Sequence, residues 1–136
     1  GILSITALKL GAKSAVGVDI DPKAEKAAGE NAALNGFGYP EFQACTGSVT
    51  EDPALMEKLA GNGHDFIFVN IVADVIISLA PVLPKLAGDK GTVILSGILD
   101  TRLAEVEQAL TRSGIDIIAR KAKEEWRCLT AKRRQA

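Results

Sequence analysis

Short apolar runs alternate with segments of helical periodicity along most of the chain. Three of these runs, at residues 15–19, 65–70 and 92–96, are apolar at nearly every internal position, which is typical of strands buried on both faces of a sheet. A further short strand is predicted at 41–46. Two more, at 115–120 and 126–131, are separated by a short charged turn and predict a closing β-hairpin.

Between these runs, apolar residues recur at helical spacing. The pattern predicts helices at about residues 2–10, 22–34, 53–59, 73–86 and 103–110. Asp21 is expected to cap the second helix and Pro22 to occupy its first turn. Pro81 and Pro84 are expected to end or kink the fourth helix, and residues 88–91 are expected to form a turn.

The order of elements determines the expected fold class. Strands that alternate with helices of about a dozen residues form right-handed parallel βαβ units. The sequence therefore predicts an α/β fold with a mostly parallel sheet, to which the closing hairpin adds an antiparallel edge. We expect a single domain over residues 1–136.

Charge and composition argue against several classes of function, namely binding of nucleic acid, of membranes and of metal ions. The 16 Lys and Arg nearly balance the 17 Asp and Glu, for a net charge of -1, so the chain has no general electrostatic footprint for nucleic acid or anionic membrane. No apolar run reaches the length of a membrane span. Cys45 and Cys128 are isolated and His64 is the single histidine, so no metal site is predicted. We expect a cytoplasmic protein with reduced thiols.

Candidate chemistry gathers at the carboxyl ends of the predicted strands, where open parallel sheets bind ligands. The small or polar residues at these ends are Asp19, Gly47-Ser48, Asn70 and Ser96-Gly97. A glycine that opens a helix, Gly1, followed about twenty residues later by an acid, Asp19, matches the end of a nucleoside-binding fingerprint. The carboxylate would accept hydrogen bonds from ribose hydroxyls. Alternatively, Asp19 caps the turn that follows it.

Asn70 is the second polar residue of interest. Its amide carries both an acceptor and donors, which suits a site that orients an amine through its hydrogens and leaves the lone pair free. The alternative is a loop asparagine that satisfies local backbone groups. No serine has a histidine partner and no phosphate-cradling GxxxxGK(S/T) loop occurs, so acyl transfer and nucleotide hydrolysis have no support.

Two stretches near the start, GILSITALKLGAK at 1–13 and VGVDIDP at 16–22, resemble the class I S-adenosylmethionine-dependent methyltransferases. Other stretches resemble more closely the bacterial family that methylates ribosomal protein L-eleven. They are ENAALNG at 30–36, NIVAD at 70–74, LSGIL at 95–99 and EEW at 124–126. The similarity covers essentially the whole chain.

This resemblance implies a Rossmann-like, seven-stranded sheet with S-adenosyl-L-methionine across its carboxyl ends. It assigns Gly1, Asp19, Ile20, Ser48 and Asn70 to cofactor binding, with Asp19 on the ribose hydroxyls. Asn70 is also the candidate catalytic residue, beside the incoming amine. The implied activity is N-methylation of lysine and α-amino groups of a ribosomal protein. No direct contact with nucleic acid or membrane is expected, and the oligomeric state is not predicted.

The family also carries elements before the position that corresponds to Gly1. These are the first strand, most of the glycine-rich loop and a substrate-recognition domain, so the domain is expected to be incomplete at its N-terminus. The strands that end at Asp19 and Asn70 would then flank an open position and expose unpaired ladder groups. Two alternatives stay open: a nicotinamide-dependent oxidoreductase of similar fold, and an inactive fragment that binds no cofactor.

Overall fold

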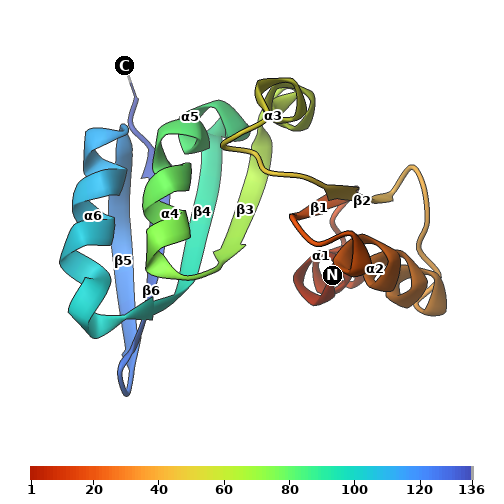
Figure 1. The fold of residues 1–136 in the computed structure, drawn as a ribbon, viewed down its shortest axis with the longest axis horizontal. Helices are drawn as coiled ribbons and strands as arrows, with labels where there is room; N and C mark the ends of the chain where they lie inside the picture. Colours follow the sequence, from red (N-terminus) through yellow and green to blue (C-terminus); the bar gives the residue numbers. More distant parts are fainter. Residues whose placement is uncertain (136) are drawn as a thin grey trace. The chain divides into compact units, whose positions relative to one another are not determined.

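The structure, a computed structural model, describes residues 1–135 and confirms the predicted order of helices and strands (Figure 1). The helices are α1 (Ile2–Lys9), α2 (Pro22–Leu34), α3 (Pro53–Ala60), α4 (Ala73–Leu79), α5 (Leu83–Leu86) and α6 (Leu103–Arg112), with short 3₁₀ helices η1 (Ala80–Val82) and η2 (Asp100–Arg102). The strands are β1 (Ala15–Asp19), β2 (Phe42–Thr46), β3 (His64–Asn70), β4 (Ala87–Leu99), β5 (Ile115–Lys123) and β6 (Trp126–Arg133). The chain divides into two compact units, Gly1–Leu55 and Met56–Ala136. No helix within residues 1–135 combines the length and the apolarity needed to cross a membrane.

The second unit contains a four-stranded sheet in the order β3-β4-β6-β5. β3 runs parallel to β4, whereas β6 pairs antiparallel with both β4 and β5, so the predicted closing hairpin is confirmed. α4 and α6 lie on one face of this sheet (Figure 1). The large apolar side chains that this unit buries completely are Ile76, Leu83, Val93, Leu95, Ile98, Val106, Leu110, Ile115 and Leu129.

Two segments of this unit that contain glycine or proline interrupt its regular structure. The helix expected over 73–86 is divided at Pro81 and Pro84, in agreement with the N–H groups that these residues lack. The turn expected at 88–91 falls within the bounds of β4, where the register with β3 jumps from His64–Ala87 to Phe66–Thr92. The chain folds back on itself there, because a Cβ on Gly91 would lie 2.9 Å from the Gly88 nitrogen and 2.5 Å from the His64 carbonyl oxygen.

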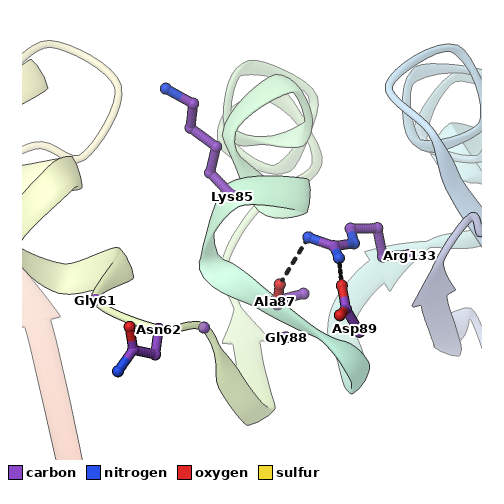
Figure 2. Close-up of a pocket in the computed structure, with 8 residues that line it drawn as sticks. Gly61, Asn62, Lys85, Ala87, Gly88, Asp89 and Arg133 are labelled. Atoms are coloured by element: carbon purple, nitrogen blue, oxygen red, sulfur yellow. Dashed lines mark hydrogen bonds and ion pairs between the residues drawn. The ribbon is translucent and has the colours of Figure 1, made fainter. Parts of the chain in front are cut away.

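A shallow hollow of about 360 Å³ lies at the amino-terminal ends of β3 and β4 (Figure 2). Its cationic side chains already have partners. Arg133 forms an ion pair with Asp89, and Lys85 donates to Glu57 at 3.0 Å. The hollow is at the end of β3 opposite to Asn70, so it is not the place where the sequence predicts a ligand.

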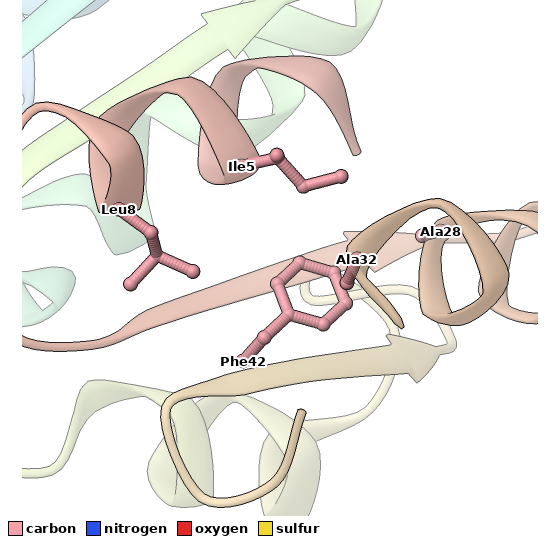
Figure 3. Packing of buried hydrophobic residues seen from close by; sticks show 5 residues of the cluster. All are labelled: Ile5, Leu8, Ala28, Ala32 and Phe42. Atoms are coloured by element: carbon pink, nitrogen blue, oxygen red, sulfur yellow. The ribbon is translucent and has the colours of Figure 1, made fainter. Parts of the chain in front are cut away.

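The first unit contains the parallel pair β1–β2, with Asp19 opposite Thr46 in the register. The helices α1 and α2 pack on this pair, and their contact is a small apolar cluster (Figure 3). Its buried members are Ile5, Leu8, Ala28, Ala32 and Phe42. Asp21 caps α2 as predicted: its Oδ1 accepts the Lys23 N–H at 2.9 Å, and Pro22 begins the helix.

Both sheets end on an apolar strand that is paired on one side only. Within residues 1–135, β1 pairs with β2 alone and β3 with β4 alone. These are the two strands that were expected to have an open edge. On β3 the rings of Phe66 and Phe68 stack with their centroids 6.4 Å apart and remain 62% and 43% exposed.

Candidate functional site

The carboxyl end of the β1–β2 pair brings together three of the predicted cofactor-binding residues. Because Asp19 lies opposite Thr46, the loop that begins at Gly47 starts beside it. The Gly47 N–H donates to the backbone carbonyl of Asp19 at 2.9 Å. Asp19, Ile20 and Ser48 therefore share one edge of the first unit.

The Asp19 side chain is exposed at this edge, and one of its oxygens is in use. Asp19 Oδ1 accepts the Asp21 N–H at 2.9 Å, which is the turn-capping role that the sequence left open as an alternative. An ionised carboxylate has a second oxygen and further acceptor positions, so this bond does not exhaust it. The neighbouring Ile20 is 76% exposed and presents an apolar side chain next to the carboxylate.

The Ser48 loop is held by its own hydrogen bonds. Ser48 Oγ lies 3.0 Å from Thr50 Oγ1, and the Ser48 carbonyl accepts the Asp52 N–H at 2.9 Å. Gly47 has a φ of +152°, a backbone conformation that L side chains rarely adopt, so this path of the loop favours glycine at its first position. The result is an ordered hydroxyl one residue beyond the strand that pairs with β1.

Gly1 precedes α1, and its carbonyl accepts the Ile5 N–H at 3.0 Å. A Cβ on Gly17 in β1 would lie 3.8 Å from Ser4 Oγ, so the first turn of α1 lies over this strand. A Cβ on Gly1 would lie 3.0 Å from the Ala28 Cβ. The small size of Gly1 is thus already needed for packing against α2, which is a structural reason for glycine beside the predicted functional one.

Asn70 belongs to the second unit, where it is the last residue of β3 and lies opposite Ser96 of β4. Its side chain is exposed at the carboxyl end of the strand. It does not cap α4, because the N-cap position is Val72.

The sequence did not predict how two residues at this end of the second unit, Gly97 and Arg102, contact their neighbours. Gly97 was recognised as a residue at a strand end, but its position beside Asn70 was not: a Cβ on Gly97 would lie 3.0 Å from Asn70 Oδ1. Arg102 donates to Glu105 Oε1 at 2.9 Å and to Asp74 Oδ1 at 2.6 Å. These hydrogen bonds, first that with Glu105, raise the pKa of Arg102 above its ordinary value. The spacing of Arg102 and Glu105 is visible in the sequence, whereas the link to Asp74 needs the tertiary structure.

His64 lies at the opposite end of β3 from Asn70. Its Nε2 is 2.5 Å from the Leu59 carbonyl oxygen, so the ring fastens the segment between α3 and β3. A dehydrogenase would need a proton-transferring side chain beside the cofactor, and this histidine does not provide one next to Asn70.

Comparison with known proteins shows which family the chain belongs to. The sequence profile of the family described as Ribosomal protein L11 methyltransferase (PrmA) matches residues 1–134. The chain belongs to this family. It is 37% identical over 133 residues to a ribosomal protein L11 methyltransferase of Agathobacter rectalis, a match that covers 98% of this chain and 41% of the relative. The chain thus spans about two fifths of the length of the curated relatives it matches.

Solved structures of family members and of more distant proteins share the fold. The crystal structure of a ribosomal protein L11 methylase from Lactobacillus delbrueckii subsp. bulgaricus is 34% identical, with a TM-score of 0.85 over 99% of this chain and 66% of that chain. A TehB-like SAM-dependent methyltransferase from Corynebacterium glutamicum is 12% identical, with a TM-score of 0.66 over 90% of this chain and 68% of that one. The Rossmann-like class I methyltransferase fold is therefore confirmed.

Proposed function

We propose that this chain forms the S-adenosyl-L-methionine-binding part of an N-methyltransferase that modifies lysine side chains and the α-amino group of ribosomal protein L11. The observation that carries the proposal is the edge shared by Asp19, Ile20 and Ser48, in a chain of the ribosomal protein L11 methyltransferase family. In this proposal the two units belong to one cofactor-binding domain over residues 1–136.

The groups at this edge fit the nucleoside part of the cofactor. Asp19 keeps a carboxylate oxygen beyond the one that binds Asp21, and ionised carboxylates form strong hydrogen bonds with hydroxyl donors such as those of ribose. Ile20 offers an exposed apolar surface to the face of the adenine ring, and covering it removes both surfaces from water. Ser48 supplies a hydroxyl from the adjacent loop, and Gly1 is the further residue that we assign to the cofactor.

Asn70 is the residue that we assign to the substrate amine. When bound, the cofactor supplies a sulfonium methyl group that is already activated toward displacement, so the main task of the protein is positioning. A lysine amine, with an ordinary pKa near 10.4, must lose a proton before its nitrogen can attack. The exposed amide of Asn70 accepts a hydrogen bond from the neutral amine and directs the nitrogen lone pair toward the methyl group.

The proposed partner is the ribosomal protein itself, which places the reaction in the cytoplasm. The nearly balanced charge of the chain, -1 in total, supports recognition of a protein and not of nucleic acid. We assign no oligomeric state.

Calorimetric titration separates this proposal from its two alternatives. The chain is titrated with S-adenosylhomocysteine and, in parallel, with NAD, and the full-length Agathobacter rectalis relative serves as the positive control. We expect binding of S-adenosylhomocysteine that Asp19→Ala weakens, and no binding of NAD. Binding of NAD alone would support the oxidoreductase. Binding of neither ligand by this chain, with binding by the control, would support the inactive fragment.

A methyl-transfer assay then tests the substrate. Radiolabelled S-adenosylmethionine is supplied together with ribosomal protein L11, and the labelled positions are located by peptide mapping. Label on lysine side chains and on the α-amino group is the expected result. Cofactor binding without label on this substrate would refute the assignment to ribosomal protein L11.

A further inference from the structure

The carboxyl-terminal half of β4 contains a bulge beside Asn70. Leu95 pairs with Leu129 of β6, and the next recorded pair is Ile98 with Arg127. Between these two pairs β4 has two residues, Ser96 and Gly97, whereas β6 has one, so β4 carries one extra residue here. Bulges of this kind bend a strand, redirect its side chains and are enriched next to active sites.

Gly97 is the residue of the bulge that only glycine can fill easily. Its φ is +78°, in the left-handed region that L side chains rarely adopt. A Cβ there would also lie 3.0 Å from Asn70 Oδ1 and 3.4 Å from the Ile71 carbonyl oxygen. Two independent features, backbone conformation and contact distance, thus place a residue without a side chain against the Asn70 amide.

We infer that Gly97 is a positioning residue for Asn70: the bulge sets the amide in place and leaves the approach to Oδ1 open for a substrate amine. This role rests on the proposed function of Asn70. A methyl group at position 97 would lie 3.0 Å from Asn70 Oδ1, so the amide would have to shift by a few tenths of an ångström and the methyl group would occupy space beside the oxygen that the amine needs. Gly97 itself contacts neither amine nor cofactor in this account.

A second glycine provides a control that separates the contact between Gly97 and Asn70 from ordinary backbone strain. Gly114 has a similar φ of +87°, and a Cβ on it would meet nothing within 4 Å. Gly114→Ala therefore introduces comparable left-handed strain without a collision. Any effect that Gly97→Ala has beyond Gly114→Ala reports on the contact with Asn70 and Ile71.

The first readout is the NMR signal of the Asn70 side-chain amide in the full chain, identified by its loss in Asn70→Asp. We expect Gly97→Ala to shift this pair of proton signals and Gly114→Ala to leave it in place. An unchanged Asn70 amide in folded Gly97→Ala would overturn the inference.

The second readout remains valid if Gly97→Ala folds poorly. In the Asn70→Ala background the collision with the amide is absent, so adding Gly97→Ala should lower the Tm by about 5 °C less than it does in the wild-type chain. The inference would be overturned if Gly97→Ala lowered the Tm equally in the two backgrounds. It would also be overturned if neither Gly97→Ala nor the double variant folded.

Methyl transfer distinguishes a failure of this inference from a failure of the proposed function. If Asn70 and Gly97 act as stated, Gly97→Ala lowers kcat and has no further effect in Asn70→Ala, while the KM for the cofactor changes little. If Asn70→Ala leaves turnover unchanged, the proposed function of Asn70 fails, and the role of Gly97 fails with it. If Asn70→Ala abolishes turnover but Gly97→Ala matches Gly114→Ala, only the role of Gly97 fails.

Discussion

The two units differ most in how deeply they bury side chains. All the large side chains that are completely buried in residues 1–135 belong to the second unit, and Leu129 and Leu95 lie in the middle of its sheet. In the first unit the least exposed residue is Ala32, at 1%, while Ile5 and Leu8 keep 8% and 7% of their surface exposed. The first unit therefore obtains less stabilisation from apolar burial than the second.

Sheet size explains this difference. Two strands alone form a sheet of marginal stability, whereas three or more strands with an apolar face support an independent core. The first unit has the pair β1–β2, and the second has four strands. The proposed nucleoside-binding residues thus lie on the weakly packed unit, and Asn70 lies on the strongly packed one. We expect the first unit to open more readily and to gain the most from a ligand.

A matched pair of leucine truncations tests the comparison with the largest expected effect. Leu129→Ala removes a side chain that is 0% exposed and should lower the free energy of unfolding of the second unit by about 2–5 kcal/mol. Leu8→Ala should cost less. Trp126, the single tryptophan, lies in β6 and reports unfolding of the second unit by fluorescence. A larger loss in Leu8→Ala, measured by amide exchange in the first unit, would contradict the ranking.

Removing the Asn70 amide tests whether the strongly packed unit carries the amine site. Asn70→Ala should lower kcat for methyl transfer by about 10²-fold, the size of effect seen when reacting groups lose their alignment. Asn62→Ala is the control, because Asn62 lies in the turn at the opposite end of β3. Equal activity in the two variants would remove Asn70 from the reaction.

Removing the Asp19 carboxylate tests whether the weakly packed unit carries the nucleoside site. Asp19→Ala should weaken binding of S-adenosylhomocysteine by about tenfold or more, since a hydrogen bond to a charged group contributes about 1.5–3 kcal/mol. Asp19→Asn keeps an acceptor for the Asp21 N–H and should weaken binding less. An affinity that is unchanged in both variants would leave Asp19 with its turn-capping role alone.

The neighbouring Asp21 supplies the smallest expected effect. Asp21→Ala removes the cap of α2 and should lower the free energy of unfolding of the first unit by about 1 kcal/mol. Any loss of affinity for S-adenosylhomocysteine should be no larger than this loss of stability. Amide exchange in α2 and calorimetry measure the two quantities on one sample. A loss of affinity as large as that of Asp19→Ala would mean that the two acids share one function.

Local patterns predicted the order of elements and the candidate site, because both depend on residues that are close in sequence. Apolar runs marked the strands, and the first polar residue after a run marked its carboxyl end, as with Asp19 and Asn70. The cap at Asp21 was readable for the same reason. Each of these features is decided within a few residues of the chain.

Features that depend on pairing between distant segments were not predictable in this way. The interruption of β4 at Gly88–Gly91 depends on its register with β3, and the bulge at Gly97 depends on the register with β6. The ion pair between Arg102 and Asp74 joins residues 28 positions apart. Glycine and arginine in these positions look ordinary in the sequence, because their partners are supplied by the fold.

Hydrogen exchange of the chain with and without S-adenosylhomocysteine tests the central claim most directly. The account predicts that the ligand slows amide exchange in the first unit most, at residues 19–21 and at Gly47-Ser48, with a smaller effect around Asn70. The hollow lined by Gly61, Asn62 and Arg133 serves as an internal reference and should not change. Protection confined to that hollow, or no protection at Asp19 at ligand concentrations that saturate the Agathobacter rectalis relative, would contradict the account.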